Sequence, residues 1–433
     1  MFKTLRNAWS IPEMRRKLLF TLFILILYRM GAAVRIPFVS ADTVDIIANL
    51  GSGGNIFEYL NILSGESFAR ATLFALSISP YITASIVMQL LSIAIPPLER
   101  LSKSGEEGQK KITQITRLVT VALAFLTAFG YYVYMRDAGL LTATGNKVFG
   151  GFVIVFCYAA GASLIMWLAE KINEHGIGNG ISIILFANII ASLIGTGNTL
   201  FTMATEDAWS LVLVEVIMFA VLVMITFVVF ITNSERRLPV QYAKKVVGRK
   251  MYGGQSTNLP IKLNMSGVMP IIFANSIVAL PSTIALIFGI DTTSGKGFWA
   301  KFLGLFNYDS WVYVVLFFIL IILFSYFYIL ISFNPVEVAN NLKKNGGFIP
   351  GIRPGKPTSD YITRVLNRVT LMGAIFLSII AIVPLVVNIL TGSQIGSLAF
   401  GGSSLLIVVG VILETTREIE AQMTMRHYKG FLE

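Results

Sequence analysis

The stretch Trp311–Phe333 reads WVYVVLFFILIILFSYFYILISF and carries no charged residue. A helix rises about 1.5 Å per residue and the bilayer's hydrocarbon core is about 30 Å thick, so roughly 20 apolar residues cross it. A helix satisfies every backbone hydrogen bond internally, as lipid requires. This stretch therefore predicts a transmembrane helix, and the chain on either side repeats the pattern.

The composition of the whole chain supports a membrane protein. Hydrophobic residues make up 55% of it and charged residues 13%, with a mean hydropathy of +0.74, whereas soluble domains carry about 25% charged residues. The single cysteine, Cys157, excludes an intrachain disulfide. Together with the first stretch, nine more segments predict ten spans: Leu18–Val34, Ala71–Ile95, Leu118–Met135, Phe149–Ala169, Ile181–Leu200, Leu211–Ile231, Gly267–Ile290, Val369–Leu390 and Leu398–Leu413.

The distribution of positive charge predicts the orientation of these spans. Most of the 34 lysines and arginines fall in segments that lie on one side if both chain ends are cytoplasmic. Cytoplasmic loops carry the excess of such residues in membrane proteins. The outer segments would hold only Arg35, Arg70, Arg136, Lys147, Lys296 and Lys301.

Three connections are long enough to suggest a role of their own. The inner segments 232–266 and 334–368 are basic, which suits either contact with anionic lipid or docking of a large cytoplasmic partner. The outer stretch Asn55–Ser67, NIFEYLNILSGES, is too short to span. It predicts either a re-entrant helix enclosed by protein or an ordinary surface helix.

Catalytic and cofactor chemistry has no visible basis in the sequence. There are two histidines, no clustered metal ligands and no complete phosphate-loop motif. We therefore expect no enzyme activity, metal or cofactor. Few ionisable residues lie within the spans, which disfavours a proton-driven transporter. Five spans in each of residues 1–200 and 201–433 suggest inverted halves, so composition alone leaves a small-solute transporter of that type as the alternative.

Several long motifs, in order along the chain, resemble the SecY family of protein-translocation channels. One position departs from the family pattern, because Ser77 stands where glycine is usual. The motifs are FALSISPYITASIVMQLL at Phe74–Leu91, WLAEKINEHGIGNGISII at Trp167–Ile184, RRLPVQYAKK at Arg236–Lys245, LPIKLNMSGVMPIIFANSI at Leu259–Ile277, FNPVEVANNLKKNGGFIPGIRPGKPT at Phe333–Thr358 and FGGSSLLIVV at Phe400–Val409.

The resemblance implies an all-α membrane protein with an hourglass pore between its two halves. A ring of aliphatic side chains would close the pore, since apolar constrictions exclude water and offer ions no ligand. Mapped by motif, this pore ring is Ile78, Ile82, Ile181, Leu185, Ile272 and Ile407. The stretch around 55–67 would be the plug, with Asn55, Ile56, Phe57, Tyr59, Leu60, Asn61, Leu63 and Ser64 as its residues.

The resemblance also implies a lateral gate between the second and third spans and the seventh and eighth. Its polar residues would be Gln89, Asn179 and Asn264, although amides at such positions also serve as ordinary interhelical hydrogen bonds. The two basic loops would dock the SecA motor or the ribosome. The residues implied are Arg249, Lys250, Lys343, Lys344, Arg353 and Lys356.

The implied activity is passage of unfolded secretory polypeptides across the bacterial plasma membrane and lateral release of membrane segments. The implied partners are SecE, SecG, SecA, the ribosome, signal peptides, nascent chains and anionic lipids. Because no nucleotide site is visible, the driving energy would come from the motor or ribosome.

Overall fold

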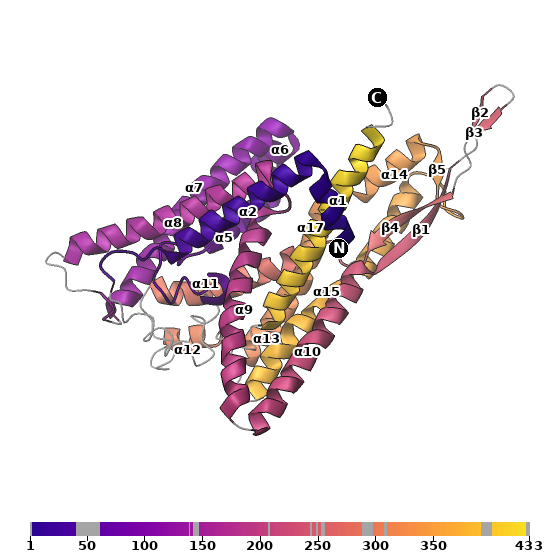
Figure 1. The fold of residues 1–433 in the computed structure, drawn as a ribbon. Coiled ribbons are helices and arrows are strands. Elements are labelled where there is room, and N and C mark those ends of the chain that lie inside the picture. Colours follow the sequence, from indigo (N-terminus) through magenta and orange to yellow (C-terminus); the bar gives the residue numbers. More distant parts are fainter. Residues whose placement is uncertain are drawn as a thin grey trace.

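The chain folds mainly into long helices that lie roughly side by side (Figure 1). The computed structural model describes residues 2–39, 61–137, 139–141, 147–206, 208–242, 245–247, 250–252, 256–287, 298–306, 310–390 and 401–429. Of the predicted plug, Asn55, Ile56, Phe57, Tyr59 and Leu60 lie outside these residues, as does Arg249 of the docking set.

Residues 1–200, the predicted N-terminal half, supply the first group of helices. Two pairs of these helices pack closely, α7 against α8 and α5 against α7. The helices are α1 (Phe2–Ser10), α2 (Pro12–Ala33), α5 (Ser79–Ala94), α6 (Pro96–Lys103), α7 (Glu106–Asp137), α8 (Lys147–His175) and α9 (Gly180–Glu206).

The rest of the chain supplies the second group, in which α13 packs between α11 and α15. Helix α11 also contacts α5 and α7, so it lies at the boundary with the first group. The helices are α10 (Ala208–Asn233), α11 (Met269–Ile287), α12 (Phe298–Gly304), α13 (Trp311–Ser332), α14 (Pro335–Lys344), α15 (Lys356–Leu390) and α17 (Gly401–Lys429).

Among the described residues, six helical stretches are long and apolar enough to cross a membrane. They contain α7, α8, α9, α10, α13 and α15, and the bent pair α5–α6 makes a seventh if counted as one span. Helix α10 exposes large apolar side chains such as Phe219 and Phe230, both 70% exposed. A lipid environment tolerates this exposure, which water would penalise. The chain is therefore a multi-pass membrane protein.

The second predicted span, Ala71–Ile95, is wrong at its start. The helix α5 begins only at Ser79, and the residues before it form a series of turns. Ser77 has a positive φ of 53°, which a helix cannot contain, and Pro80 stands in the first turn. Proline lacks a backbone N–H and is tolerated there. The predicted span started too early because the residues before Ser79 are mostly apolar. They are buried, but they are not helical.

The two basic inner loops contain strands, so the all-α expectation holds for the helical body only. Strand β1 (Glu235–Tyr242) pairs antiparallel with β4 (Ser256–Lys262), and β2 (Lys245–Val247) pairs with β3 (Lys250–Tyr252) at the hairpin tip. The short β5 (Gly347–Phe348) pairs with the other edge of β1, with Gln241 opposite Phe348. The two loops are therefore joined into one three-stranded sheet (Figure 1).

Helix α1, near the start of the chain, lies against the end of α17 (Figure 1). The Thr4 hydroxyl donates to Glu420 at 3.0 Å, and the Lys17 ammonium donates to Gln422 at 3.0 Å.

Candidate pore and docking surface

All six predicted ring positions belong to the large apolar cluster that forms the core of the helical body. They come from four parts of the chain: the start of α5, then α9, α11 and α17. Five of the side chains are at most 3% exposed, and the half-buried Ile181 packs against the same cluster. The ring members are Ile78, Ile82, Ile181, Leu185, Ile272 and Ile407.

Local geometry explains why these side chains face inward. Ile82 lies one turn after Ile78, and Leu185 lies one turn after Ile181, so each pair shares one helical face. Ile78 is the N-cap residue of α5, immediately after the positive-φ Ser77. That turn directs the chain into α5 with Ile78 already buried. Because aliphatic side chains offer no hydrogen bonds, the cluster can seal against water and ions.

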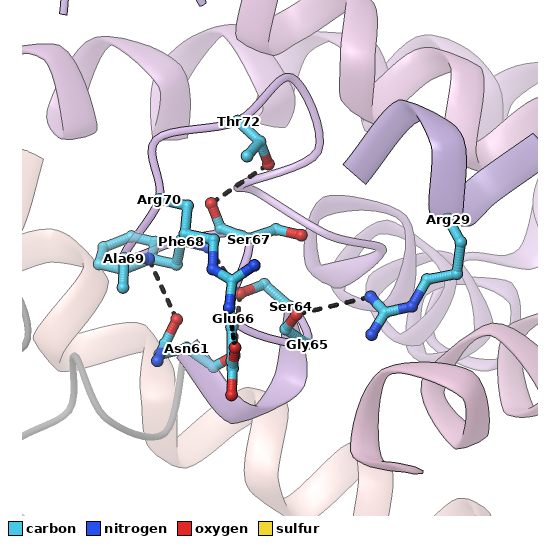
Figure 2. A network of polar contacts seen from close by, with 10 residues as sticks. All are labelled: Arg29, Asn61, Ser64, Gly65, Glu66, Ser67, Phe68, Ala69, Arg70 and Thr72. Carbon is cyan, nitrogen blue, oxygen red and sulfur yellow. Dashed lines mark hydrogen bonds and ion pairs between the residues drawn. The ribbon is translucent and has the colours of Figure 1, made fainter. Parts of the chain in front are cut away.

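Residues 61–72, which include Asn61, Leu63 and Ser64 of the predicted plug, form a compact unit with its own polar network (Figure 2). The Asn61 side chain accepts from the backbone N–H of Ala69, and the Ser64 hydroxyl accepts from that of Phe68. The Thr72 hydroxyl donates to the Ser67 carbonyl. These bonds satisfy backbone groups that no helix satisfies, so the non-helical segment can remain buried at membrane depth.

Three helices and Ser77, which precedes α5, bind this segment through its backbone carbonyls. Tyr131 of α7 donates to the Phe68 carbonyl at 2.6 Å, with their rings 4.4 Å apart. Arg29 of α2 reaches the Gly65 carbonyl at 3.5 Å (Figure 2). The Leu63 carbonyl accepts from both Ser77 and Asn188 of α9. The sequence marks Ser77 as a departure from the family pattern, but the acceptor that it shares with Asn188 is visible only in the fold.

The three predicted gate residues occupy different settings. Asn179 caps α9, accepting from the backbone N–H groups of Ile181 and Ser182. Asn264 is buried after β4 and accepts from the Ser266 hydroxyl at 3.3 Å. Gln89 is half-buried on α5. The described contacts of Asn179 are local ones that fix the start of α9, as N-cap residues commonly do.

The predicted docking residues that the structure describes lie on one exposed surface. Lys343 and Lys344 end α14, whose first turn is capped by Asn334 through two backbone N–H groups. Arg353 is exposed in a turn between Gly351 and Gly355, which both have positive φ, and Lys356 begins α15. Of Lys250 only the backbone is described, within β3. The apolar side of the sheet packs under this surface through Leu238, Val240, Ile261, Ile349, Ile362 and Leu366.

A charged joint, not predicted from the sequence, connects the base of the β1–β4 hairpin to α17. Arg417 donates to the Thr232 carbonyl at 2.7 Å and to Asn233 Oδ1 at 2.8 Å, at the C-terminal end of α10. Burial raises the pKa of the nearby Glu414 carboxyl, and burial also lowers the pKa of Lys262 on β4. Ile407 lies on the same helix as Arg417 and Glu414, so ring and hairpin share one rigid element.

Long apolar helices around a buried aliphatic cluster, with a largely non-helical segment beside it and a sheet at one end, form the architecture of a multi-pass membrane channel. A family profile described as SecY matches residues 72–416. The protein translocase subunit SecY of Mycobacterium bovis is 44% identical over 445 residues, covering 100% of both chains. The chain belongs to the SecY family, and its function is that of a protein-conducting translocation channel.

Two solved structures share the fold. One concerns a SecY protein whose plug domain stabilises the closed state of the translocation channel and maintains a membrane seal. It aligns with a TM-score of 0.62 and 18% identity, covering 94% of this chain and 92% of that one. The other is Sec61 in the canine ribosome–channel complex, with a TM-score of 0.57, 17% identity and the same coverages.

Proposed function

We propose that unfolded secretory polypeptides cross the bacterial plasma membrane through the centre of this chain, between residues 1–200 and 201–433. The full channel has ten spans, with both termini cytoplasmic, and α5 and α7 part from α11 and α13 to release apolar segments into lipid. The packing of α11 on both α5 and α7 supports this seam. Gln89, Asn179 and Asn264 lie near it and adjust their hydrogen bonds when it opens.

The observation that carries the proposal is the position of the six ring residues. They are remote in sequence, yet they share one buried cluster rather than facing lipid. Apolar side chains from separate helices can part around a sliding chain without binding any particular sequence. When the polypeptide leaves, they close again because apolar contact excludes water.

Replacing ring residues with glycine tests this assignment. Ile82→Gly and Ile181→Gly remove side chains that fill the constriction, so ion conductance across planar bilayers containing the closed channel should rise several-fold. The exposed Ile319 of α13, 52% exposed, provides the control, since Ile319→Gly removes the same side chain from the lipid-facing side. Silent bilayers with both ring variants would refute the ring.

The same proposal assigns a partner to each cytoplasmic feature. SecA or the ribosome docks on the joined basic loops through Arg249, Lys250, Lys343, Lys344, Arg353 and Lys356 and supplies the energy. Arginine suits this role because its planar group pairs bidentately with carboxylates or phosphates. SecE and SecG complete the complex within the membrane, and anionic lipids contact the basic side. The chain itself carries out no reaction, and it needs no cofactor.

A small-solute transporter is not favoured. Family membership favours a translocation channel over this alternative. The described residues contain no group of three potential metal ligands.

A further inference from the structure

We propose that Ser77 and Asn188 are positioning residues that couple the proposed pore ring to segment 61–72, so that ring opening and movement of this segment are one event. Asn188 Nδ2 donates to the Leu63 carbonyl at 2.8 Å and to Ser77 Oγ at 3.1 Å. Ser77 Oγ donates to the same carbonyl at 3.0 Å. The three groups form a closed triangle of hydrogen bonds, here called the Leu63 triangle.

Two of the triangle's three residues are enclosed. Asn188 is 0% exposed and Ser77 is 2% exposed, while Leu63 is half-buried. Gly65 lies so close to α9 that an added Cβ would stand 3.1 Å from the Asn188 Cα. Little room is left for water beside the two donors. A buried carbonyl that loses its donors costs about 1–3 kcal/mol, more than the bonds contribute when intact.

Sequence position attaches the triangle directly to the ring. Ser77 precedes ring residue Ile78, and Asn188 follows ring residue Leu185 by one turn on α9. An outward shift of either ring residue therefore moves a donor away from the Leu63 carbonyl. The ring can widen only if the triangle breaks or if Leu63 moves with it.

Ser77 holds its place against local strain. Its φ of 53° lies in the left-handed region, which is costly for a residue with a side chain. A hydroxyl that binds two partners compensates for this cost, whereas glycine would adopt the conformation freely but bind neither partner. Mutation can therefore separate the two effects: alanine at position 77 removes the hydroxyl and keeps the backbone strain, whereas glycine removes both.

The test measures ion leak through the intact translocase complex in planar bilayers, and it rests on the proposed ring. Ser77→Ala, Ser77→Gly and Asn188→Leu should each raise the leak about fivefold, as expected for loss of one net hydrogen bond. The double variant Ser77→Ala/Asn188→Leu should leak more than either single variant, because each single change leaves the Leu63 carbonyl one donor and the double change leaves it none. Ser378→Ala is the control, since that buried hydroxyl bonds only within α15.

The outcomes separate the coupling from its alternatives. Unchanged leak in Ser77→Ala and Asn188→Leu overturns the coupling, as does a double variant that leaks no more than the single variants. A leak in Ser77→Ala that is absent in Ser77→Gly assigns the effect to backbone strain and also overturns it. Ile82→Gly, measured on the same bilayers, reports on the ring separately: if it leaks while the triangle variants do not, only the coupling fails.

Discussion

Two arginines of this chain, Arg353 and Arg417, differ in role because their surroundings differ. Arg353 is exposed in a turn held by two positive-φ glycines, and the Thr358 hydroxyl donates to its carbonyl at 2.8 Å. The backbone is therefore fixed while the guanidinium is free to reach outward. Arg417, of the same type, is instead committed to two acceptors inside the molecule.

Reversing the charge at Arg353 should weaken docking without disturbing the fold. A charge-assisted pair contributes about 1.5–3 kcal/mol, so Arg353→Glu should reduce motor affinity roughly tenfold or more. Binding of SecA to membranes containing the channel, and SecA-driven export of a secretory protein, measure the effect. Arg136→Glu makes the same change at the far end of α7 and should leave both unchanged. Normal export with Arg353→Glu would contradict the docking assignment.

Glu414 predicts a dependence of stability on pH. Burial raises its pKa above the ordinary 4.5, and Glu418 raises it further, against the opposing effects of Arg417 and Lys262. The folded state therefore binds the proton more tightly than the unfolded state. This contribution to stability is complete below the ordinary pKa and is lost as pH rises through the raised value.

Glu414→Gln should remove the loss of folding stability that the parent suffers as pH rises. The variant should unfold at a higher temperature than the parent near neutral pH, and the difference should shrink as pH falls toward the ordinary pKa. Thermal unfolding of the detergent-solubilised complex across this pH range measures it. Glu420→Gln, near the end of the same helix, is the control. A parent and variant that differ equally at every pH would show that proton binding is not the cause.

At the scale of elements, the main finding is that separate loops become one unit. The β1–β5 pairing joins segments about a hundred residues apart, and Arg417 fastens the hairpin base to α17. A force on the docking surface therefore has a rigid path to the helix that carries Ile407. Hydropathy could not predict this arrangement, because the strands lie in polar loops and their pairing is non-local.

Arg417→Ala should loosen this joint. Loss of two bonds from a charged donor should destabilise the hairpin base by about 1.5–3 kcal/mol. Hydrogen exchange at the backbone of 232–242 and 256–262 should speed up, while α13 keeps its protection. Arg364→Ala, an exposed change on α15, serves as the comparison. If exchange in the hairpin did not change, the hairpin would be held by its sheet and apolar contacts alone.

The sequence predicted the helices best where the requirement to cross the bilayer alone determines the pattern. Uninterrupted apolar runs such as Trp311–Phe333 match α13 closely, because the bilayer fixes both length and polarity. The rule failed at residues 71–78, where apolar residues are buried by protein rather than by lipid. The ring positions came from family resemblance and stay a prediction, because the cluster that contains them also contains most of the apolar core. The Leu63 triangle was not predictable, since it depends on a backbone carbonyl in a non-helical turn.

At the scale of the whole molecule, the proposed opening requires residues 61–72 to move relative to the helices that enclose them. The Glu66 side chain meets α9 at Gly195, where an added Cβ would stand 3.6 Å from the Glu66 Cδ. The cysteine pair Glu66→Cys with Gly195→Cys tests this movement, and the extent of bridging is measured because cysteine is shorter than glutamate. Cys157, the chain's single cysteine, is first replaced by alanine so that only the new pair can form a bridge.

Oxidation of this pair should fasten the segment to α9 and reduce translocation of a secretory protein at least tenfold, because a covalent bond cannot be outcompeted by the entering polypeptide. Reductant should restore transport, and each single-cysteine variant should be insensitive to oxidant. The extent of bridging is measured on the same samples by labelling of free thiols. Full transport through channels shown to be bridged would mean that this segment stays still during opening, and the seal would have to be displaced from elsewhere.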